Sequence, residues 1–431
     1  MRELELAFAE ELAVVGVHSG KYIAERVTSR IVDATLRLGA THPVVNDRQY
    51  RTWRGYAVNA WPTIVAIDPR GYILGQHAGE FTAEALAPFI ENMSAASRAK
   101  GELELGTHSF PQQRGTHTPG VLDYPDAVAI DGDRIAISDT GHHRLLIGTL
   151  DEERRAVTVQ HVVGSGVSAL QDGIPGAFDT PQGMAFDGNT LYVTDAANHA
   201  VRAVDLGTGA LRTVAGDGNQ LRTSADIERG RLSSPWDVTV ANGTLYVAMA
   251  GSHQIYAIDP RTGTVRVHAG TRAEALQDGP LAEAALAQPM GIANDGTTLY
   301  FADAESSAIR TASIGPAGEV RTLVGTGLFD FGDKDGTGDD VRLQHPQRLA
   351  RHRDGRILIA DSYNDALKWL DPASRRVTTW VRGFNEPGGV ACGERCAYVA
   401  DTNAHRICAV EYETGAMREL EIILPGQLEA R

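Results

Sequence analysis

Two of the three cysteines lie close together, in Cys392-Gly-Glu-Arg-Cys396, and they are the first residues whose spacing could support chemistry. Thiol–disulfide exchange needs a thiolate and usually a second cysteine that resolves the mixed disulfide. Because the pair flanks a predicted hairpin turn, the side chains could face one another and form a cross-strand disulfide. Three cysteines in 431 residues nevertheless fit a reducing compartment, where both would be small side chains filling the hairpin. We therefore assign no catalytic cysteine.

Recurring histidines invite comparison with a metal site. They are His142, His143, His199, His253 and His405. They fall in the polar tetrad of a repeated unit, so most are separated from the next by a whole unit. Recurrence at one place favours a role in a hairpin turn. Metal ligation needs side chains that converge, and we do not predict it here.

The segment that begins Asp330-Phe-Gly-Asp-Lys-Asp-Gly is as rich in carboxylates as a calcium-binding loop. Placing Gly336 at the sixth position of such a loop puts Phe331 at the first and Arg342 at the twelfth, and neither residue supplies the carboxylate required there. Asp-Gly pairs also occur at 172–173 and 278–279, between other units. The sequence thus predicts turns rather than a calcium site.

Nucleotide and serine-hydrolase motifs are missing from the sequence. No Gly-x-Gly-x-x-Gly follows a predicted strand, and neither a Walker loop nor a Gly-x-Ser-x-Gly elbow occurs. We predict no bound cofactor and no metal.

A repeated unit of strand, turn and strand is expected to position the cysteine pair, the recurring histidines and the Asp-Gly segments. Each copy starts at a proline, alternates apolar and polar residues, turns at Gly or Asp, and runs into an apolar stretch that usually ends in Asp. The prolines are Pro125, Pro181, Pro235, Pro289, Pro346 and Pro387. The acids are Asp139, Asp195, Asp303, Asp361 and Asp401, and the third copy has Met249 instead.

The spacing of the prolines, 56, 54, 54, 57 and 41 residues, leaves room for four short strands and a loop in each unit. A single four-stranded blade cannot bury its own faces, so such units stack radially into a ring. The sequence therefore predicts a mainly β fold with a six-bladed β-propeller. How the ring closes is left open, because 102–106 could pair with the last blade or be linker, and 417–423 could supply its outer strand.

One ring of residues, two positions after each proline, is expected around the central channel. It consists of Ala127, Gly183, Asp237, Gly291, Arg348 and Gly389. A metal-dependent lactonase or lyase would need converging carboxylates or imidazoles, which this ring does not supply. Asp237 and Arg348 with Trp236 could form a polar mouth for the charged end of a ligand or for a peptide. The structural alternative is an ion pair beside a packed indole.

The first hundred residues have a different, α/β pattern. Strands are predicted at 13–18, 43–47, 61–68 and 72–75, and helices at 25–38, near Tyr50 and at 82–93. Asp68-Pro-Arg-Gly between two of the strands predicts a turn-linked antiparallel pair. Residues 1–12 have a helical apolar face formed by Leu4, Phe8 and Leu12.

Several segments resemble the NHL repeat-containing protein 2 family, including its bacterial members, over nearly the whole chain. They are Val15-Gly-Val-His-Ser, His42-Pro-Val-Val-Asn-Asp, Trp61-Pro-Thr, Ser233-Ser-Pro-Trp-Asp-Val, Met249-Ala-Gly-Ser-His-Gln-Ile, Glu305-Ser-Ser and Leu343-Gln-His-Pro. The resemblance implies a thioredoxin-like domain joined to a six-bladed NHL propeller, and a cis peptide bond at Pro62. It also implies a Cys-x-x-Cys upstream of the strand at 13–18, which this sequence lacks.

We expect the thioredoxin-like domain to be incomplete, either because the reading frame starts late or because the domain is a degenerate remnant. The absent part would include the strand between those at 13–18 and 63–68. Neighbouring strands lie about 4.8 Å apart, so its loss would leave a gap of roughly 10 Å or force the two strands to pair anew.

Charge and hydropathy limit the classes of partner. The net charge of −15 arises after residue 100, where 29 basic and 44 acidic residues lie, and such an acidic ring is a poor nucleic-acid binder. No apolar run approaches the roughly 18 residues of a membrane span, and the start Met1-Arg-Glu-Leu-Glu-Leu is too acidic for a signal peptide. We predict a cytoplasmic protein that contacts neither nucleic acid nor membrane.

The sequence thus predicts a truncated thioredoxin-like domain at 1–95, a linker at 96–120 and the propeller at 121–425. The predicted function is that of a binding or scaffold protein with a redox-inactive thioredoxin-like module. Its candidate contacts with a protein or peptide partner are Trp61, Pro62, Trp236, Asp237 and Arg348. The alternatives are a thiol–disulfide oxidoreductase whose Cys-x-x-Cys lies upstream of this start and, less favoured, a metal-dependent propeller lactonase or lyase.

Overall fold

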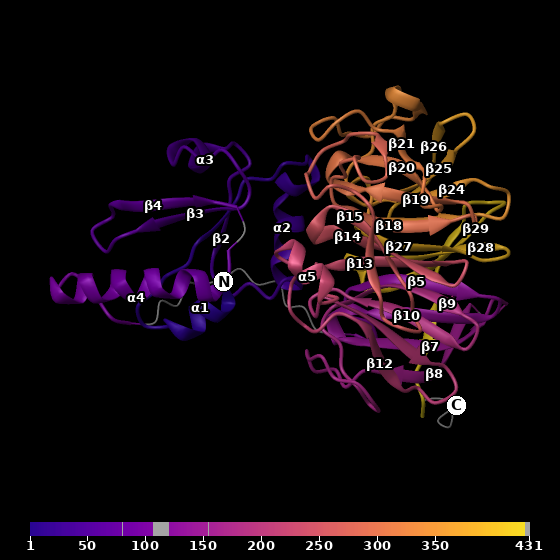
Figure 1. The fold of residues 1–431 in the computed structure, drawn as a ribbon, viewed down its shortest axis with the longest axis horizontal. Coiled ribbons are helices and arrows are strands. Elements are labelled where there is room, and N and C mark those ends of the chain that lie inside the picture. The colour runs from indigo at the N-terminus through magenta and orange to yellow at the C-terminus, as the bar shows by residue number, and fades with distance from the viewer. Residues whose placement is uncertain (80, 107–119, 154, 427–431) are drawn as a thin grey trace. The chain divides into compact units, whose positions relative to one another are not determined.

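The computed structural model describes residues 1–79, 81–106, 120–153 and 155–426. The chain divides into two compact units, Met1–Thr118 and Pro119–Arg431. The first is the indigo and purple part of Figure 1, and the second runs from magenta to yellow. We call them the α/β unit and the propeller.

The α/β unit alternates helices with short strands, as the sequence predicts. Its helices are α1 (Arg2–Ala7), the 3-10 turn η1 (Ala24–Arg26), α2 (Thr28–Arg37), α3 (Arg51–Gly55) and α4 (Ala83–Ala99). Its strands are β1 (Gly16–His18), β2 (Val44–Asn46), β3 (Thr63–Ile67) and β4 (Ile73–Ala78). β1 and β2 pair in parallel, and β3 and β4 pair antiparallel.

Local chemistry explains the turn and the last helix. The Asp68 carboxylate accepts hydrogen bonds from the amides of Arg70 and Tyr72, which fixes the predicted turn between β3 and β4. Thr82 caps α4 by accepting from the amide of Ala85. The helix continues six residues past the predicted end, to Ala99, because the added residues include three alanines, the best helix formers. Its last turn therefore lies in the predicted linker, of which 107–119 fall outside the described residues.

The two strand pairs form separate sheets, so β1 and β3 do not pair within the described part of the α/β unit. Of the two outcomes considered for these strands, a new pairing between them is therefore not observed. Each sheet has two edges and leaves apolar side chains exposed, among them Val17, Val45, Ile67 and Ile73.

The second unit is a six-bladed propeller, as the repeats predict (Figure 1). Each blade is an antiparallel sheet of four consecutive strands. Blade 1 comprises β5 (Pro125–Asp131), β6 (Arg134–Asp139), β7 (Arg144–Asp151) and β8 (Ala156–Val163). Blade 2 comprises β9 (Pro181–Asp187), β10 (Thr190–Asp195), β11 (Ala200–Asp205) and β12 (Leu211–Ala215). Blade 3 comprises β13 (Pro235–Ala241), β14 (Thr244–Met249), β15 (Gln254–Ile258) and β16 (Val265–Ala269). Blade 4 comprises β18 (Pro289–Asn294), β19 (Thr298–Asp303), β20 (Ala308–Ser313) and β21 (Glu319–Val324). Blade 5 comprises β23 (Arg348–Arg351), β24 (Ile357–Asp361), β25 (Ala366–Asp371) and β26 (Arg376–Arg382). Blade 6 comprises β27 (Pro387–Cys392), β28 (Cys396–Asp401), β29 (Arg406–Glu411) and β30 (Met417–Glu419).

Short elements accompany the blades. A 3-10 turn joins the second strand to the third in all blades but the second: η2 (Thr140–His142), η3 (Ala250–Ser252), η4 (Ala304–Ser306), η6 (Ser362–Asn364) and η7 (Thr402–Ala404). The interblade loops hold α5 (Ser224–Glu228), β17 (Gly279–Pro280), β22 (Gly336–Thr337) and η5 (Gly338–Asp340). β17 and β22 add a fifth strand to the outer edges of blades 4 and 5.

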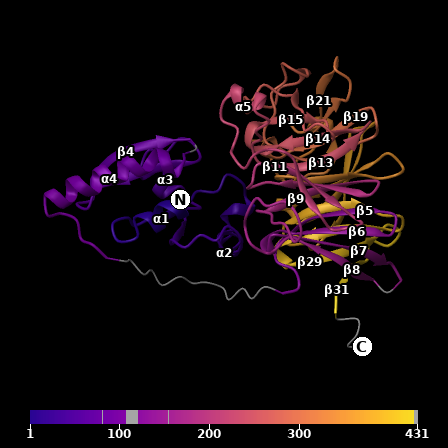
Figure 2. The ribbon, with the colours of Figure 1, turned by 60° about the horizontal axis from the view of Figure 1, so that its bottom comes forward.

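The ring closes by a route that the sequence left open. β30 is the outer strand of blade 6, and the chain then crosses to blade 1, where β31 (Glu421–Ile423) pairs in parallel with β8. Figure 2 shows β31 in yellow beside the magenta β8. Residues 102–106 form no strand, and the amide of Gly106 donates to the carbonyl of Glu10. Closure thus depends on the C-terminal end of the described propeller, not on the segment that precedes it.

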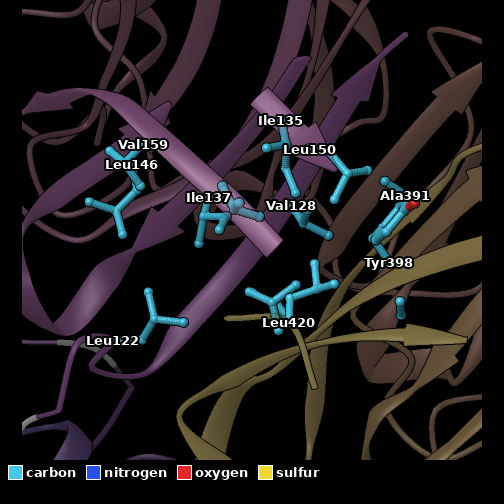
Figure 3. Packing of buried hydrophobic residues seen from close by; sticks show 14 residues of the cluster. Leu122, Val128, Ile135, Ile137, Leu146, Leu150, Val159, Ala391, Tyr398 and Leu420 are labelled. Atoms are coloured by element: carbon cyan, nitrogen blue, oxygen red, sulfur yellow. The ribbon is translucent and has the colours of Figure 1, made fainter. Parts of the chain in front are cut away.

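The propeller core consists of one apolar cluster at each of the six interfaces between neighbouring blades. Alternate residues of a strand face opposite neighbours: Ile357 and Ile359 pack towards blade 4, and Leu358 and Ala360 pack towards blade 6. Figure 3 shows the interface of blades 1 and 6, where Ile137 and Leu146 belong to the same cluster as Tyr398. Each fully buried leucine or isoleucine contributes about 1.5–3 kcal/mol, so these clusters hold the ring together.

Candidate functional site

In the α/β unit, an exposed aromatic residue stands beside a cis-proline. The Trp61–Pro62 peptide is cis, as the family resemblance implied. The Trp61 side chain is 47% exposed, yet its position is fixed from two sides. Its Nε1 donates to the carbonyl of Ser19 at 2.9 Å, and its ring lies 4.5 Å from that of Trp53. The indole of Trp61 is thus held in one position by the protein while about half of it stays exposed.

A buried carboxylate holds the segments that carry this aromatic pair. Asp47 accepts from the hydroxyl of Ser19 at 2.9 Å and from the amides of Arg51 and Trp53 at 2.8 and 2.9 Å. Burial by itself raises the pKa of the Asp47 carboxyl, but these hydrogen bonds hold it below its ordinary value. Asp47 therefore stays ionised and ties the start of α3 to the end of β1.

At the propeller axis, Arg348 connects four blades. From β23 in blade 5, its Nη2 donates to Asp126 Oδ2 in blade 1 at 2.9 Å and to the carbonyl of Trp236 in blade 3 at 3.2 Å. A longer contact of 3.4 Å reaches Gln182 Oε1 in blade 2. The arginine is only 3% exposed, so its guanidinium links blades 1, 2, 3 and 5 by buried hydrogen bonds.

Asp237 lies close to this centre but makes a different contact. Its Oδ2 accepts from the amide of Ile292 in blade 4 at 3.0 Å. Burial raises the pKa of Asp237 to about 6, against the nearby positive charge of Arg348, which lowers it. The inner strands come so close here that a Cβ added at Gly291 would lie 2.6 Å from the Cα of Arg348. This explains glycine at that position of the ring.

The arrangement differs from the polar mouth expected from the sequence. Asp237 and Arg348 are buried, and the hydrogen-bonded partner of Arg348 is Asp126 rather than Asp237. The Trp236 indole packs on Ala250, Met290 and Ala304. Asp126 and Gln182 were not predicted, because each lies one residue after a repeat proline, whereas the predicted ring comprised the residues two positions after each proline.

The cysteine pair does not face across its hairpin. Cys392 lies opposite Ala397 in the register of β27 and β28, so Cys396 points to the other face of the blade. Cys392 packs between blades 5 and 6, and Cys396 packs between blades 6 and 1. The alternative of a cross-strand disulfide is therefore wrong, and all three thiols are free, in agreement with the favoured interpretation of two small side chains in the hairpin.

Their surroundings also suppress thiolate formation. Burial raises the pKa of Cys392 to about 12, and burial with Glu152 and Glu411 raises that of Cys396. Cys396 lines a cavity of about 520 Å³ at the seam of blades 6 and 1. Thiol-based catalysis at this pair is disfavoured because the nucleophile would be protonated.

Four of the five recurring histidines make contacts between blades, and the fifth, His142, pairs with Asp139 of its own blade. His143, His199, His253 and His405 each have a positive φ, and each ring Nδ1 accepts from the amide of the residue before a neighbouring blade's first proline. The distances are 3.0–3.2 Å. Ser307 and Asp365 accept the same hydrogen bond in the remaining two places. The pattern confirms a structural turn role, and His405 makes the contact that joins blade 6 to blade 1.

A second repeated feature, not recognised in the sequence, is a cation beside the acid of the repeat, which is fully buried in blades 2, 4 and 5. Arg202 Nη1 donates to Asp195 at 2.7 Å, and Arg310 Nη1 donates to Asp303 at 2.8 Å, with both partners inaccessible to solvent. Arg144, Lys368 and Arg406 pair with the acids of blades 1, 5 and 6. The signal was present as an arginine or lysine five or seven residues after each acid.

The loops that resemble calcium sites belong to this feature. Asp172 and Asp278 accept from Arg202 and Arg310 at 2.9 and 3.0 Å, and Asp333 accepts from Lys368 at 2.7 Å. Their carboxylates therefore already neutralise buried cations. Among the described residues, no group of three or more His, Cys, Asp or Glu side chains is arranged to hold a metal ion.

No helix in the described ranges is both long and apolar enough to cross a membrane.

Comparison with known proteins gives relatives over nearly the whole chain, although no protein-family model matches it. The chain is 34% identical to NHL repeat-containing protein 2 of Gallus gallus over 481 residues, covering 99% of this chain and 65% of the relative. The human protein of the same name is 33% identical, covering 98% of this chain and 65% of the relative. Protein SUPPRESSOR OF QUENCHING 1, chloroplastic, of Arabidopsis thaliana is 35% identical, covering 94% and 42%.

The chain thus spans slightly less than two thirds of the length of the animal relatives. Among solved structures, a chain of a nidogen/laminin complex overlays with a TM-score of 0.47 and 16% identity, covering 65% of this chain and 91% of that chain.

Proposed function

We propose that the chain, which belongs to the family of NHL repeat-containing protein 2, is a binding or scaffold protein whose propeller and α/β unit present surfaces to a protein or peptide partner. The observation that carries the proposal is Trp61. An exposed tryptophan whose ring is already fixed loses little conformational entropy on binding, and such residues dominate the energetics of protein interfaces.

The proposal treats the α/β unit as a thioredoxin-like module without redox turnover. Two features support it: the order of its strands and helices, and the cis-proline directly before β3. In the sequence given, all three cysteines lie in the sixth blade. Trp61 and Pro62 are the proposed contacts of this module, and Trp236, Asp237 and Arg348 are those of the propeller.

The proposed setting is the cytoplasm, with neither nucleic acid nor membrane as partner. The reducing compartment inferred from the cysteines and the acidity of the propeller support this setting. Because one relative is named as chloroplastic, fractionation of the native cell is the direct test of location.

Substitution of the exposed tryptophan tests the function. Partners captured from the native cell by the wild-type chain are identified and purified, and their affinities for the variants are then measured by titration. We expect Trp61→Ala to weaken binding by about 10–30-fold, the loss typical of an interface anchor.

Leu38→Ala is the matched control, because Leu38 is also an exposed apolar residue of the α/β unit, at 79% exposure. Unchanged affinity for every captured partner with Trp61→Ala would refute the role of Trp61. Catalytic reduction of insulin disulfides by the purified chain would contradict the redox-inactive assignment.

A further inference from the structure

The contact that His199 makes between blades requires a neutral ring. At the seam of blades 2 and 3, its Nδ1 accepts from the amide of Ser234 at 3.0 Å. A backbone amide can only donate a hydrogen bond, so the Nδ1 that accepts it must carry no proton. Protonation of the ring would turn Nδ1 into a donor, and two N–H groups would then face each other. The contact therefore exists only while His199 is uncharged.

Two other seams contain a carboxylate that compensates for this loss. Asp179 Oδ1 lies 3.5 Å from Nδ1 of His143, and Asp123 Oδ1 lies 3.4 Å from Nδ1 of His405. A protonated ring can donate to that carboxylate, so the two blades stay connected. Both aspartates lie two residues before a repeat proline. At the seam of blades 2 and 3 the corresponding residue is Ser233, which supplies no carboxylate.

The surroundings of His199 oppose its charge. Burial has the largest effect, and Arg222, in the loop that leads to blade 3, adds a positive charge. Asp179, in the loop that leads to blade 2, acts in the opposite direction. Together these effects hold the pKa of His199 below its ordinary value of 6.5. The unfolded chain thus binds this proton more tightly than the folded one, so the stabilisation is fully present above about pH 6.5 and is lost as the pH falls.

The amide of Ser234 lies at the start of an inner strand. Ser234 directly precedes Pro235, the first residue of β13, and its contact with His199 joins it to blade 2. A second contact from blade 2 lies close by, because the Thr194 hydroxyl donates to the carbonyl of Trp236 at 3.0 Å. Release of the Ser234 amide would therefore loosen the start of β13 without detaching it.

We propose that His199 is an acid-sensitive latch between blades 2 and 3, which holds the amide of Ser234 while the ring is neutral and releases it when the ring is protonated. The start of β13 is then held less tightly on the side that faces blade 2. This conformational response to pH goes beyond the proposed function and does not depend on it.

Hydrogen exchange of the Ser234 amide in the full chain tests the latch. Exchange at pH 5 to 7.5 is followed by mass spectrometry with fragmentation to single residues, and each rate is divided by the intrinsic rate at that pH. We expect protection of the wild-type amide to fall about 10-fold from pH 7 to pH 5, as for the loss of one hydrogen bond. The amide of His345, which donates to Ser307 Oγ at 3.2 Å, should change less than about 2-fold because a hydroxyl does not titrate in this range.

His199→Asn removes the titration and keeps an acceptor. Asparagine tolerates the left-handed backbone of this position, where φ is 47°, and its Oδ1 accepts at every pH used. We expect acid to lower the protection of Ser234 by less than about 2-fold in this variant. His143→Asn, the same change at the neighbouring seam, is the matched control and should leave the response of Ser234 intact. A loss in His199→Asn as large as in the wild type would assign the response to Asp195 or Asp237, whose pKa values burial raises to about 6, and would overturn the proposal.

Arg222→Gln gives a second reading that keeps His199 in place. Arg222 is exposed, so the fold tolerates the change, and removing its charge should make protonation of His199 easier. The midpoint of the loss of protection at Ser234 should rise by about 0.3 pH units. A midpoint that does not rise, equal protection of the wild-type amide at pH 5 and pH 7, or loss of the response in His143→Asn would each overturn the proposal.

Discussion

Blades 3 and 4 are neighbours built from the same repeat, yet they fill the same buried position with opposite chemistry. In blade 4, Arg310 binds Asp303, Asp278 and the carbonyls of Ala285 and Gln277, all within 2.8–3.0 Å. In blade 3, Met249 takes the place of the acid and is completely buried.

The third blade has also lost the cation. The positions five and seven residues after Met249 are Gln254 and Tyr256, which bind each other through the tyrosine hydroxyl at 3.2 Å. Gln254 also donates to the carbonyl of Gly270 at 2.8 Å. Both charges are absent together, because either charge alone would be buried without compensation. In this propeller the repeat acid and its cation are therefore replaced together, as a pair, and not one at a time.

The largest loss of stability is expected when the cation of blade 4 alone is removed. Arg310→Met leaves Asp303 and Asp278 without their partner, and Asp303 is inaccessible to solvent. We expect the free energy of unfolding of the propeller to fall by about 3–5 kcal/mol, measured by urea denaturation at pH 7.

The matched control changes both members of the pair. Asp303→Met with Arg310→Tyr gives blade 4 the side chains that blade 3 has in place of the acid and the cation, although Ala308 remains at the position of Gln254, and the loss should be well below that of Arg310→Met alone. A double variant as unstable as the single one would show that the pair is not the unit of substitution.

The reverse change is the next largest. Met249→Asp places a carboxylate in the apolar cluster of blades 2 and 3, where no cation faces it. We expect a loss of about 2–4 kcal/mol at pH 7, with partial recovery below pH 5 as the new carboxyl is protonated. Met249→Leu, which keeps volume and polarity, should cost under about 1.5 kcal/mol. Equal stability of the two variants at pH 7 would contradict the account.

The smallest effect is expected at Asp237, a buried carboxylate on the first strand of blade 3. The pKa of Asp237 rises from 3.8 to about 6 in the folded state, which therefore binds the proton more tightly than the unfolded chain. This stabilisation is fully present below about pH 4 and is lost as the pH rises through 6. Asp237→Asn should thus be more stable than the wild type at pH 7, by about 1–3 kcal/mol.

That advantage of Asp237→Asn should shrink towards pH 4, because the wild-type carboxyl is then also neutral. Urea denaturation between pH 4 and 8 measures the difference. A difference that is constant over this range would show that the charge of Asp237 does not cause it.

Much of the fold could be predicted because its signals are local. The six prolines, the alternation of apolar residues and the turn glycines each report on a few neighbouring residues, and every blade forms where they predict it. The turn role of His199 and the failure of the calcium motif at Gly336 followed from the same local pattern.

The candidate sites were predicted less well because they depend on register and on distant partners. The faces of Cys392 and Cys396 are set by which residue of β28 lies opposite Cys392, and a shift of one residue would exchange them. Arg310 could be found as a recurring residue, but its burial against a loop some thirty positions earlier could not.

By itself the sequence determined six blades and an α/β unit ahead of them, since repetition and residue pattern are properties of short segments. The tertiary structure alone decided that Arg348 pairs with Asp126, 222 residues away, and that β31 closes the ring on β8. Such contacts form only after the ring has brought the first and last blades together, and no local pattern records the path by which it closes.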